Sequence, residues 1–176
     1  MTKQTKIAAA VLGLLLVATV VLLMLNSPSA QEKQELSKSG SFKITLDGTT
    51  KTVTMKDIEA VGISDISANY KPSGKQPVTR VYQGVSFAAL LKYLELDTVA
   101  LAEKNTSVVF TAIDGYTTAI KMEEALDAGT CAIVVSLENK PIGSKEDGGT
   151  GPYMMVLPQD QFSQRWCKFL GEVTFQ

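Results

Sequence analysis

The sequence contains no histidine, and this absence removes several classes of function. Without an imidazole there is no Ser-His or Cys-His nucleophile pair. Histidine-ligated zinc, histidine-ligated haem and a histidine proton switch near neutral pH are excluded as well. A catalyst built on this chain must therefore use Cys, carboxylate, Lys, Arg, Tyr or a bound cofactor.

Positive charge is also scarce. The chain has 17 Lys and Arg against 18 Asp and Glu, a net charge of −1. Lys3 and Lys6 precede the first acidic residue, Glu32, so residues 31–176 carry 15 basic and 18 acidic groups, a net charge of −3. Binding to phosphate backbones needs a clear positive excess or a basic stripe. Nucleic acid is therefore not expected as a partner.

Charged residues are missing altogether from residues 7–25, an apolar run of 19 residues. This length is close to the ~20 residues that span a bilayer and exceeds the usual 7–15 of a signal-peptide core. The lysines before the run place that end in the cytoplasm. We expect a signal anchor within residues 1–30, hence a single-pass cell-membrane protein with its domain outside. A cleaved signal peptide and a secreted domain are the alternative.

Cysteine occurs only twice, as Cys131 and Cys167. An even number in an oxidising compartment is typical of a disulfide. Two buried free thiols are the equal alternative, because the sequence does not show whether the two residues lie within the ~6 Å that a bridge requires. A redox-active pair is disfavoured because there is no C-x-x-C.

Residues 31–40 are polar and indicate a tether, and residues 41–176 form the globular domain. Short apolar runs and alternating patterns within it predict strands, most of them outside βαβ units, with two or three short helices. The expected fold class is α+β, with a mixed, mostly antiparallel sheet. Strands are expected at residues 42–46, 51–55, 63–71, 77–85, 107–113, 116–120, 131–137, 153–158 and 168–176, helices at 56–61, 86–96 and 121–126, and connectors at 97–105 and 139–141.

Four segments, in this order, carry a resemblance to a known family: DGYTTAIKMEEAL (114–126), IVVSLENKPI (133–142), GGTGPYMMVLP (148–158) and RWCKFLGEV (165–173). Together with VYQGVSFAALLKYLEL (81–96) they resemble the molybdopterin-binding domain of the sulfite oxidase family. The resemblance covers roughly residues 78–175, and it rests on the ordered set rather than on any single motif.

The resemblance implies an α+β domain that holds molybdopterin and carries out oxygen-atom or electron transfer. Arg165 and Lys168 occupy positions where the family has basic residues that face the pterin phosphate. Tyr116 would line the cavity, and the loop around Gly149 would bring backbone N–H groups near an anion. Fuller family members hold the metal through a Cys before the Leu-rich helix, yet residues 65–85 contain no Cys.

A missing thiolate removes the ligand that suits this metal. We therefore expect a membrane-tethered, extracytoplasmic binding or interaction module that is not catalytic. Whether it binds molybdopterin or no cofactor stays open. Two alternatives remain: a molybdopterin-dependent oxidoreductase, and an accessory subunit of a membrane redox complex in which residues 7–25 pack against other subunits.

Overall fold

The computed structural model describes residues 40–71, 76–144 and 147–176. The expected signal anchor, and all of the expected tether before Gly40, lie outside these residues. Among the described residues, no helix is long and apolar enough to cross a membrane.

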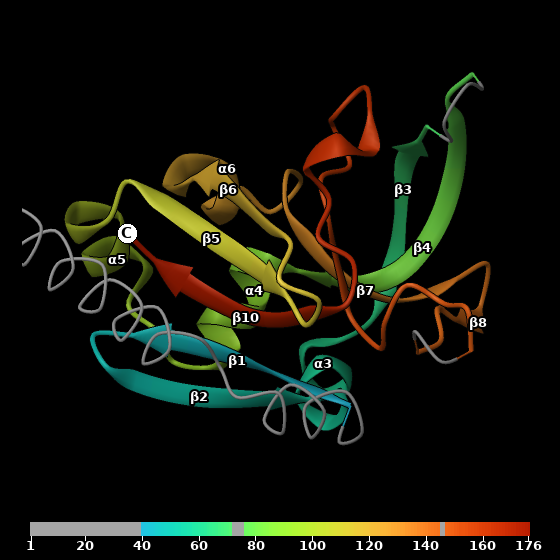
Figure 1. The fold of residues 1–176 in the computed structure, drawn as a ribbon. Coiled ribbons are helices and arrows are strands. Elements are labelled where there is room, and N and C mark those ends of the chain that lie inside the picture. The colour runs from blue at the N-terminus through green and yellow to red at the C-terminus, as the bar shows by residue number, and fades with distance from the viewer. Residues whose placement is uncertain (1–39, 72–75, 145–146) are drawn as a thin grey trace, which may run out of the picture. The chain divides into compact units, whose positions relative to one another are not determined.

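Two five-stranded sheets make up most of the domain (Figure 1). The first, sheet A, has the order β2-β1-β10-β5-β6. Its β1–β10 pair is parallel and its other pairs are antiparallel. Asp47 and Gly48, a pair of residues typical of hairpin turns, form the turn between the first two strands, both with positive φ. The strands are β1 (Ser41–Leu46), β2 (Thr49–Thr54), β5 (Ser107–Ala112), β6 (Thr117–Lys121) and β10 (Leu170–Phe175).

Sheet B has the order β3-β4-β7-β8, and β9 also pairs with β7. All of its pairs are antiparallel. Figure 1 shows β3 and β4 as a long hairpin that extends beside the short 3₁₀ helix η1 (Ser163–Arg165). The strands are β3 (Ser64–Tyr70), β4 (Val78–Ser86), β7 (Ala132–Leu137), β8 (Lys140–Pro141) and β9 (Met154–Val156).

The α+β class and the mostly antiparallel pairing are confirmed, but the described residues hold four α-helices rather than two or three. They are α3 (Met55–Val61), α4 (Phe87–Tyr93), α5 (Thr98–Lys104) and α6 (Met122–Leu126). The additional helix, α5, lies in the stretch that was expected to be a connector. Its N-cap Asp97 accepts hydrogen bonds from two backbone N–H groups. Only one of its residues, Leu101, is buried. The sequence therefore shows no repeating apolar pattern from which this helix could be predicted.

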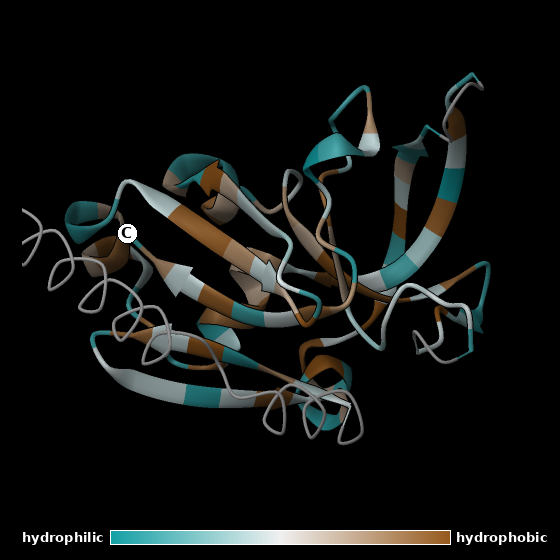
Figure 2. Ribbon diagram, viewed as in Figure 1, coloured by the Kyte–Doolittle hydropathy of each residue, from teal (hydrophilic) through white to brown (hydrophobic). Residues whose placement is uncertain are grey.

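Apolar side chains that recur at helical spacing in α4 form part of the core. Phe87, Leu90 and Leu91 of α4 are completely buried, whereas Leu94 is half-buried. The Phe87 ring packs edge-on against Phe110 of β5, with ring centres 5.2 Å apart. Each such side chain contributes roughly 1.5–3 kcal/mol by burial. Figure 2 shows the hydrophobic and hydrophilic bands that alternate along the strands.

The last strand differs from the prediction at its start. The alternation of the sequence predicts one shared face, which would be formed by Phe169, Gly171, Val173 and Phe175. Instead a β-bulge interrupts the pairing of β10 with β5 between Leu170 and Glu172. Leu170 is fully buried as a result, while Phe169 is only half-buried. A bulge adds one residue to one strand, so it reverses the alternation on one side of it.

Candidate ligand-binding site

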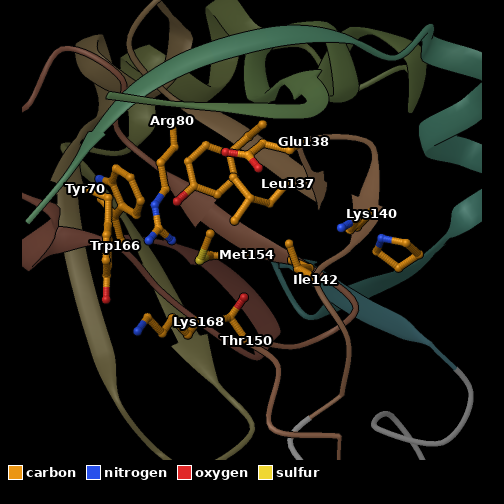
Figure 3. A pocket seen from close by; sticks show the side chains of 12 residues that line it. Tyr70, Arg80, Leu137, Glu138, Lys140, Ile142, Thr150, Met154, Trp166 and Lys168 are labelled. Carbon is orange, nitrogen blue, oxygen red and sulfur yellow. The ribbon is translucent and has the colours of Figure 1, made fainter. Parts of the chain in front are cut away.

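A pocket of about 280 Å³ opens between the β3–β4 hairpin, the β7–β8 turn and the segment that leads into β10 (Figure 3). We call it the Trp166 pocket. Its volume lies near the low end of ligand sites, which span roughly 300–1,000 Å³. It is lined by Tyr70, Arg80, Tyr82, Leu137, Glu138, Lys140, Pro141, Ile142, Thr150, Met154, Trp166 and Lys168.

The hairpin wall follows from the two-residue period of strands. Arg80 and Tyr82 are two positions apart on β4, so both side chains point to the same face. Tyr70 joins them because β3 pairs Tyr70 with Val78 and Ala68 with Arg80. The Arg80 guanidinium consequently lies over the Tyr70 ring, 4.3 Å from its centre.

Trp166 has an indole N–H with no hydrogen-bond partner among the described residues. The residue is only 4% exposed, and its ring packs edge-on against Tyr82, with centres 5.6 Å apart. Buried donors are nearly always paired, and an unpaired one costs about 1–3 kcal/mol. The indole N–H is itself enclosed by the protein, so the part of Trp166 that lines the pocket is its apolar ring.

The pocket carries an excess of positive charge. Arg80, Lys140 and Lys168 line it against a single carboxylate, that of Glu138. None of the three cations forms an ion pair with another residue in the described ranges. Burial raises the pKa of the Tyr82 hydroxyl, and the neighbouring Arg80 opposes this effect. The site therefore favours an anionic group on its ligand.

Glu138 occupies a turn where its backbone is strained. The sequence placed a turn at Asn139-Lys140-Pro141, but Lys140 and Pro141 form β8 and the turn consists of Glu138 and Asn139. Both have positive φ, 51° and 63°. Such two-residue hairpin turns prefer Asn, Asp and Gly, so a Glu at the first position is unusual. A non-glycine residue held there costs on the order of 1–3 kcal/mol.

Gln83 of β4 holds this turn in place. Its side-chain oxygen accepts hydrogen bonds from the Ser136 hydroxyl and the Asn139 backbone N–H, both at 2.9 Å. Its amide nitrogen donates to Asp65 at 2.9 Å. Gln83 is only 8% exposed, so its partners are protein groups rather than bulk water. The rim that carries Glu138 is therefore fixed to the sheet.

A second pocket of about 330 Å³ shares Trp166 and Lys168 with the first. Tyr116, one of the residues predicted from the sequence, lines this second pocket. Its hydroxyl donates a hydrogen bond to the Gln164 carbonyl at 3.0 Å. The structure thus brings Tyr116 and Lys168 to one cavity, and it places Lys168 between the two pockets.

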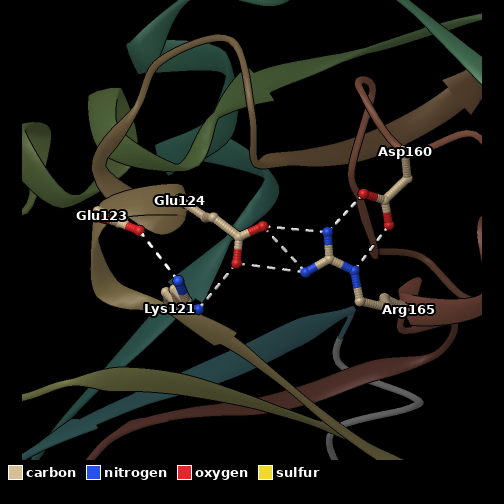
Figure 4. A network of polar contacts seen from close by, with 5 residues as sticks. All are labelled: Lys121, Glu123, Glu124, Asp160 and Arg165. Carbon is tan, nitrogen blue, oxygen red and sulfur yellow. Dashed lines mark hydrogen bonds and ion pairs between the residues drawn. The ribbon is translucent and has the colours of Figure 1, made fainter.

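Arg165, the other predicted basic residue, lies outside the lining of both pockets. Its guanidinium donates to Glu124 of α6 at 3.0 Å and, through Nε, to Asp160 at 2.9 Å (Figure 4). Asp160, followed by Glu124, raises the pKa of Arg165. Both edges of the planar group are occupied, so Arg165 joins α6 to the 160–165 segment instead of facing a ligand.

Gly149 is required by the close packing of its loop. A Cβ at this position would lie 2.1 Å from the Ile142 carbonyl oxygen. The Gly149 backbone N–H donates to the Ser144 carbonyl at 2.8 Å. This donor is therefore used within the loop, and the neighbouring Thr150 lines the Trp166 pocket in its place.

The thiols do not fit a molybdenum site. Cys131 and Cys167 are free cysteines, so of the two alternatives left open the free thiols hold. Both are completely buried, and neither lines the Trp166 pocket. Burial raises the pKa of both thiols, that of Cys167 to about 12, so neither is a thiolate at neutral pH. The described residues contain no group of three His, Cys, Asp or Glu that could hold a metal.

The sequence matches no family model and no curated protein. Among solved structures, the chain is similar to the sulfane dehydrogenase SoxCD from Paracoccus pantotrophus, with a TM-score of 0.59 and 13% identity. The similarity covers 77% of this chain and 37% of that chain, so this chain spans little more than a third of that protein. At this identity the likeness shows a related fold and says nothing about chemistry.

Proposed function

We propose that this protein is a ligand-binding module on a sulfite oxidase-type fold, and that it is not a molybdenum enzyme. The binding role rests on one observation: Arg80, Lys140 and Lys168 line a pocket that contains a single carboxylate. A ligand with an anionic group pairs with the ammonium of Lys168 beside the Trp166 ring. The aromatic rings of Tyr70 and Tyr82 supply the apolar walls that small-molecule sites use.

The state of the two thiols supports the proposal that the protein is not a molybdenum enzyme. A molybdenum site of the expected kind needs a thiolate at the cofactor, whereas both thiols here are protonated and enclosed in the core. The alternative function, a molybdopterin-dependent oxidoreductase, is favoured only by the fold shared with a dehydrogenase. The pterin part of that cofactor fits the pocket better than its metal does, because Lys168 and Arg80 can face a phosphate.

Metal and pterin analysis separates the two functions. The full-length chain is purified in detergent from a host that makes molybdopterin. It is then analysed for molybdenum and tungsten, and for pterin fluorescence after oxidation. We expect no stoichiometric metal. One metal atom and one pterin per chain would overturn the proposal and support the oxidoreductase function instead.

The pocket itself is tested with anilinonaphthalene sulfonate, a planar aromatic anion. Trp166 is the single tryptophan of the chain and lines both pockets that contain Lys168, so quenching of its fluorescence reports on a ligand beside that lysine. We expect saturable quenching that weakens about tenfold in Lys168→Gln. Lys92→Gln, an exposed lysine of α4, is the matched control. Equal affinity in the two variants would contradict the assignment of the anion site.

The membrane tether stays part of the proposal, because residues 7–25 lie outside the described residues. A signal anchor would keep the full chain in the membrane fraction after alkaline washing, with the domain outside the cytoplasm. Release into the soluble fraction after removal of residues before the domain would show a cleaved signal peptide. Co-purification of further subunits in detergent would instead support an accessory role in a membrane complex.

A further inference from the structure

We propose that the Trp166 pocket selects a zwitterion with separated charges: a planar ring that carries an anionic group at one end and an ammonium group at the other. The anionic group binds Lys168 beside the Trp166 ring, and the ammonium binds Glu138. This inference rests on the proposed binding function and names the class of ligand.

The charges of the pocket are arranged at two ends. Trp166 and Lys168 come from the segment that leads into β10, and Glu138 comes from the β7–β8 turn. Figure 3 shows Lys168 and Glu138 at opposite ends of the pocket, with Met154 and the Arg80 guanidinium between them. A ligand that spans the pocket therefore meets the Lys168 ammonium at one end and the Glu138 carboxylate at the other.

The Glu138 carboxylate has capacity for a ligand. It accepts no hydrogen bond and no ion pair from the other residues of the described ranges, although three cations line the same pocket. An ammonium group would give it a charge-assisted hydrogen bond. A ligand with anionic groups at both ends would be repelled there.

The positive φ of Glu138 indicates that its side chain has a role other than forming the turn. Asn or Gly would adopt its positive φ at less cost, and the next position is indeed Asn139. Gln83 then fixes the turn to β4, which holds the carboxylate at the pocket. Strain that is retained at a pocket, together with a fixed support, is typical of a binding residue.

The test compares three probes that share one ring: para-aminomethylbenzoate with both charges, para-toluate with the anionic group alone, and benzylamine with the ammonium alone. Binding to the full-length chain is followed by the indole N–H resonance of Trp166, which is the one tryptophan of the chain. We expect para-aminomethylbenzoate to bind about tenfold more tightly than either partial probe.

The matched variants are Glu138→Gln and Glu95→Gln. Glu95 also has positive φ, 57°, and is exposed, but it does not line the pocket. Glu138→Gln should abolish the preference for para-aminomethylbenzoate over para-toluate, while Glu95→Gln should retain it.

Two outcomes would overturn the zwitterion proposal. Equal affinity of the wild type for para-aminomethylbenzoate and para-toluate would leave a plain anion site, so the proposed binding function would stand without this inference. A shift of the Trp166 resonance by none of the three probes would also overturn it. The sulfonate titration and the metal analysis decide the proposed function independently.

Discussion

The guanidinium of Arg80 lies 4.3 Å from the centre of the Tyr70 ring, on the neighbouring strand and diagonal to it. Lys168 approaches the same ring to 5.8 Å, although it comes from a distant part of the sequence. One aromatic ring thus holds two cations beside Trp166. Attraction to the ring face offsets part of the repulsion between the two positive charges.

This contact predicts a measurable coupling between Arg80 and Tyr70. In a double-mutant cycle with Arg80→Met and Tyr70→Leu, we expect a coupling free energy of about 0.5–1 kcal/mol. Urea denaturation of the four proteins gives the value. A coupling near zero would show that the stacking contributes nothing to stability.

The clamp formed by Arg165, Glu124 and Asp160 predicts a loss of stability when the arginine is removed. Arg165→Met should lower the free energy of unfolding by about 1–2 kcal/mol, less than for a fully buried pair because the Arg165 side chain is 40% exposed. Lys104→Met removes an exposed pair with Asp47 and should change stability by less than about 0.5 kcal/mol. Similar losses in both variants would contradict a special role for the clamp.

The same clamp predicts a dependence on pH. Burial raises the pKa of Glu124, but hydrogen bonds from the Lys121 backbone N–H and from Arg165 outweigh it and leave the pKa below its ordinary 4.5. A carboxyl with a lowered folded-state pKa stabilises the protein above its unfolded pKa, and this contribution is lost as pH falls through the folded value. Below pH 4.5, the melting temperature should therefore decrease less steeply with falling pH in Arg165→Met than in the wild type. Identical profiles would show that Arg165 does not act on Glu124.

The strained turn predicts that Glu138→Gly does not destabilise the protein. Glycine adopts positive φ without steric cost, and its greater freedom in the unfolded chain offsets part of this gain. We expect the free energy of unfolding to stay constant or to rise by up to about 1 kcal/mol. Asn139→Gly is the control. Its free energy of unfolding should rise less, since Asn tolerates positive φ. A loss in Glu138→Gly would show that its side chain stabilises the free protein.

Because both thiols are buried, we expect neither cysteine to react with thiol reagents in the folded protein. Native protein at pH 8 should react with neither of its two thiols on the timescale of minutes, because both are enclosed and their pKa values are raised. Both should react after unfolding in urea. The melting temperature should be the same with and without a reducing agent. A lower melting temperature under reducing conditions would indicate a disulfide.

Much of the fold can be predicted from local pattern. The Asp47-Gly48 turn and the apolar face of α4 can be predicted because each depends on neighbouring residues. The α5 helix depends on the Asp97 cap and a single buried residue, which is too little for a periodic pattern. The bulge in β10 depends on how that strand pairs with β5, and this pairing joins distant segments.

The binding site was harder to predict, because it is assembled from three separated segments. Lys168 was identified through its position in a family pattern. The spacing of Arg80 and Tyr82 on one strand was a visible signal, but only the pairing of β3 with β4 brings Tyr70 to them. The unpaired state of the Trp166 indole N–H is a property of the packed structure and has no sequence signal.

The position of β10 has a consequence for the order in which the domain can form during synthesis. This strand lies between β1 and β5, although it follows both along the chain. Sheet A cannot complete its centre until residues 170–175 have left the ribosome. The β1–β2 and β5–β6 pairs therefore stay unjoined during most of the synthesis of the domain, and the last strand of the sheet joins them.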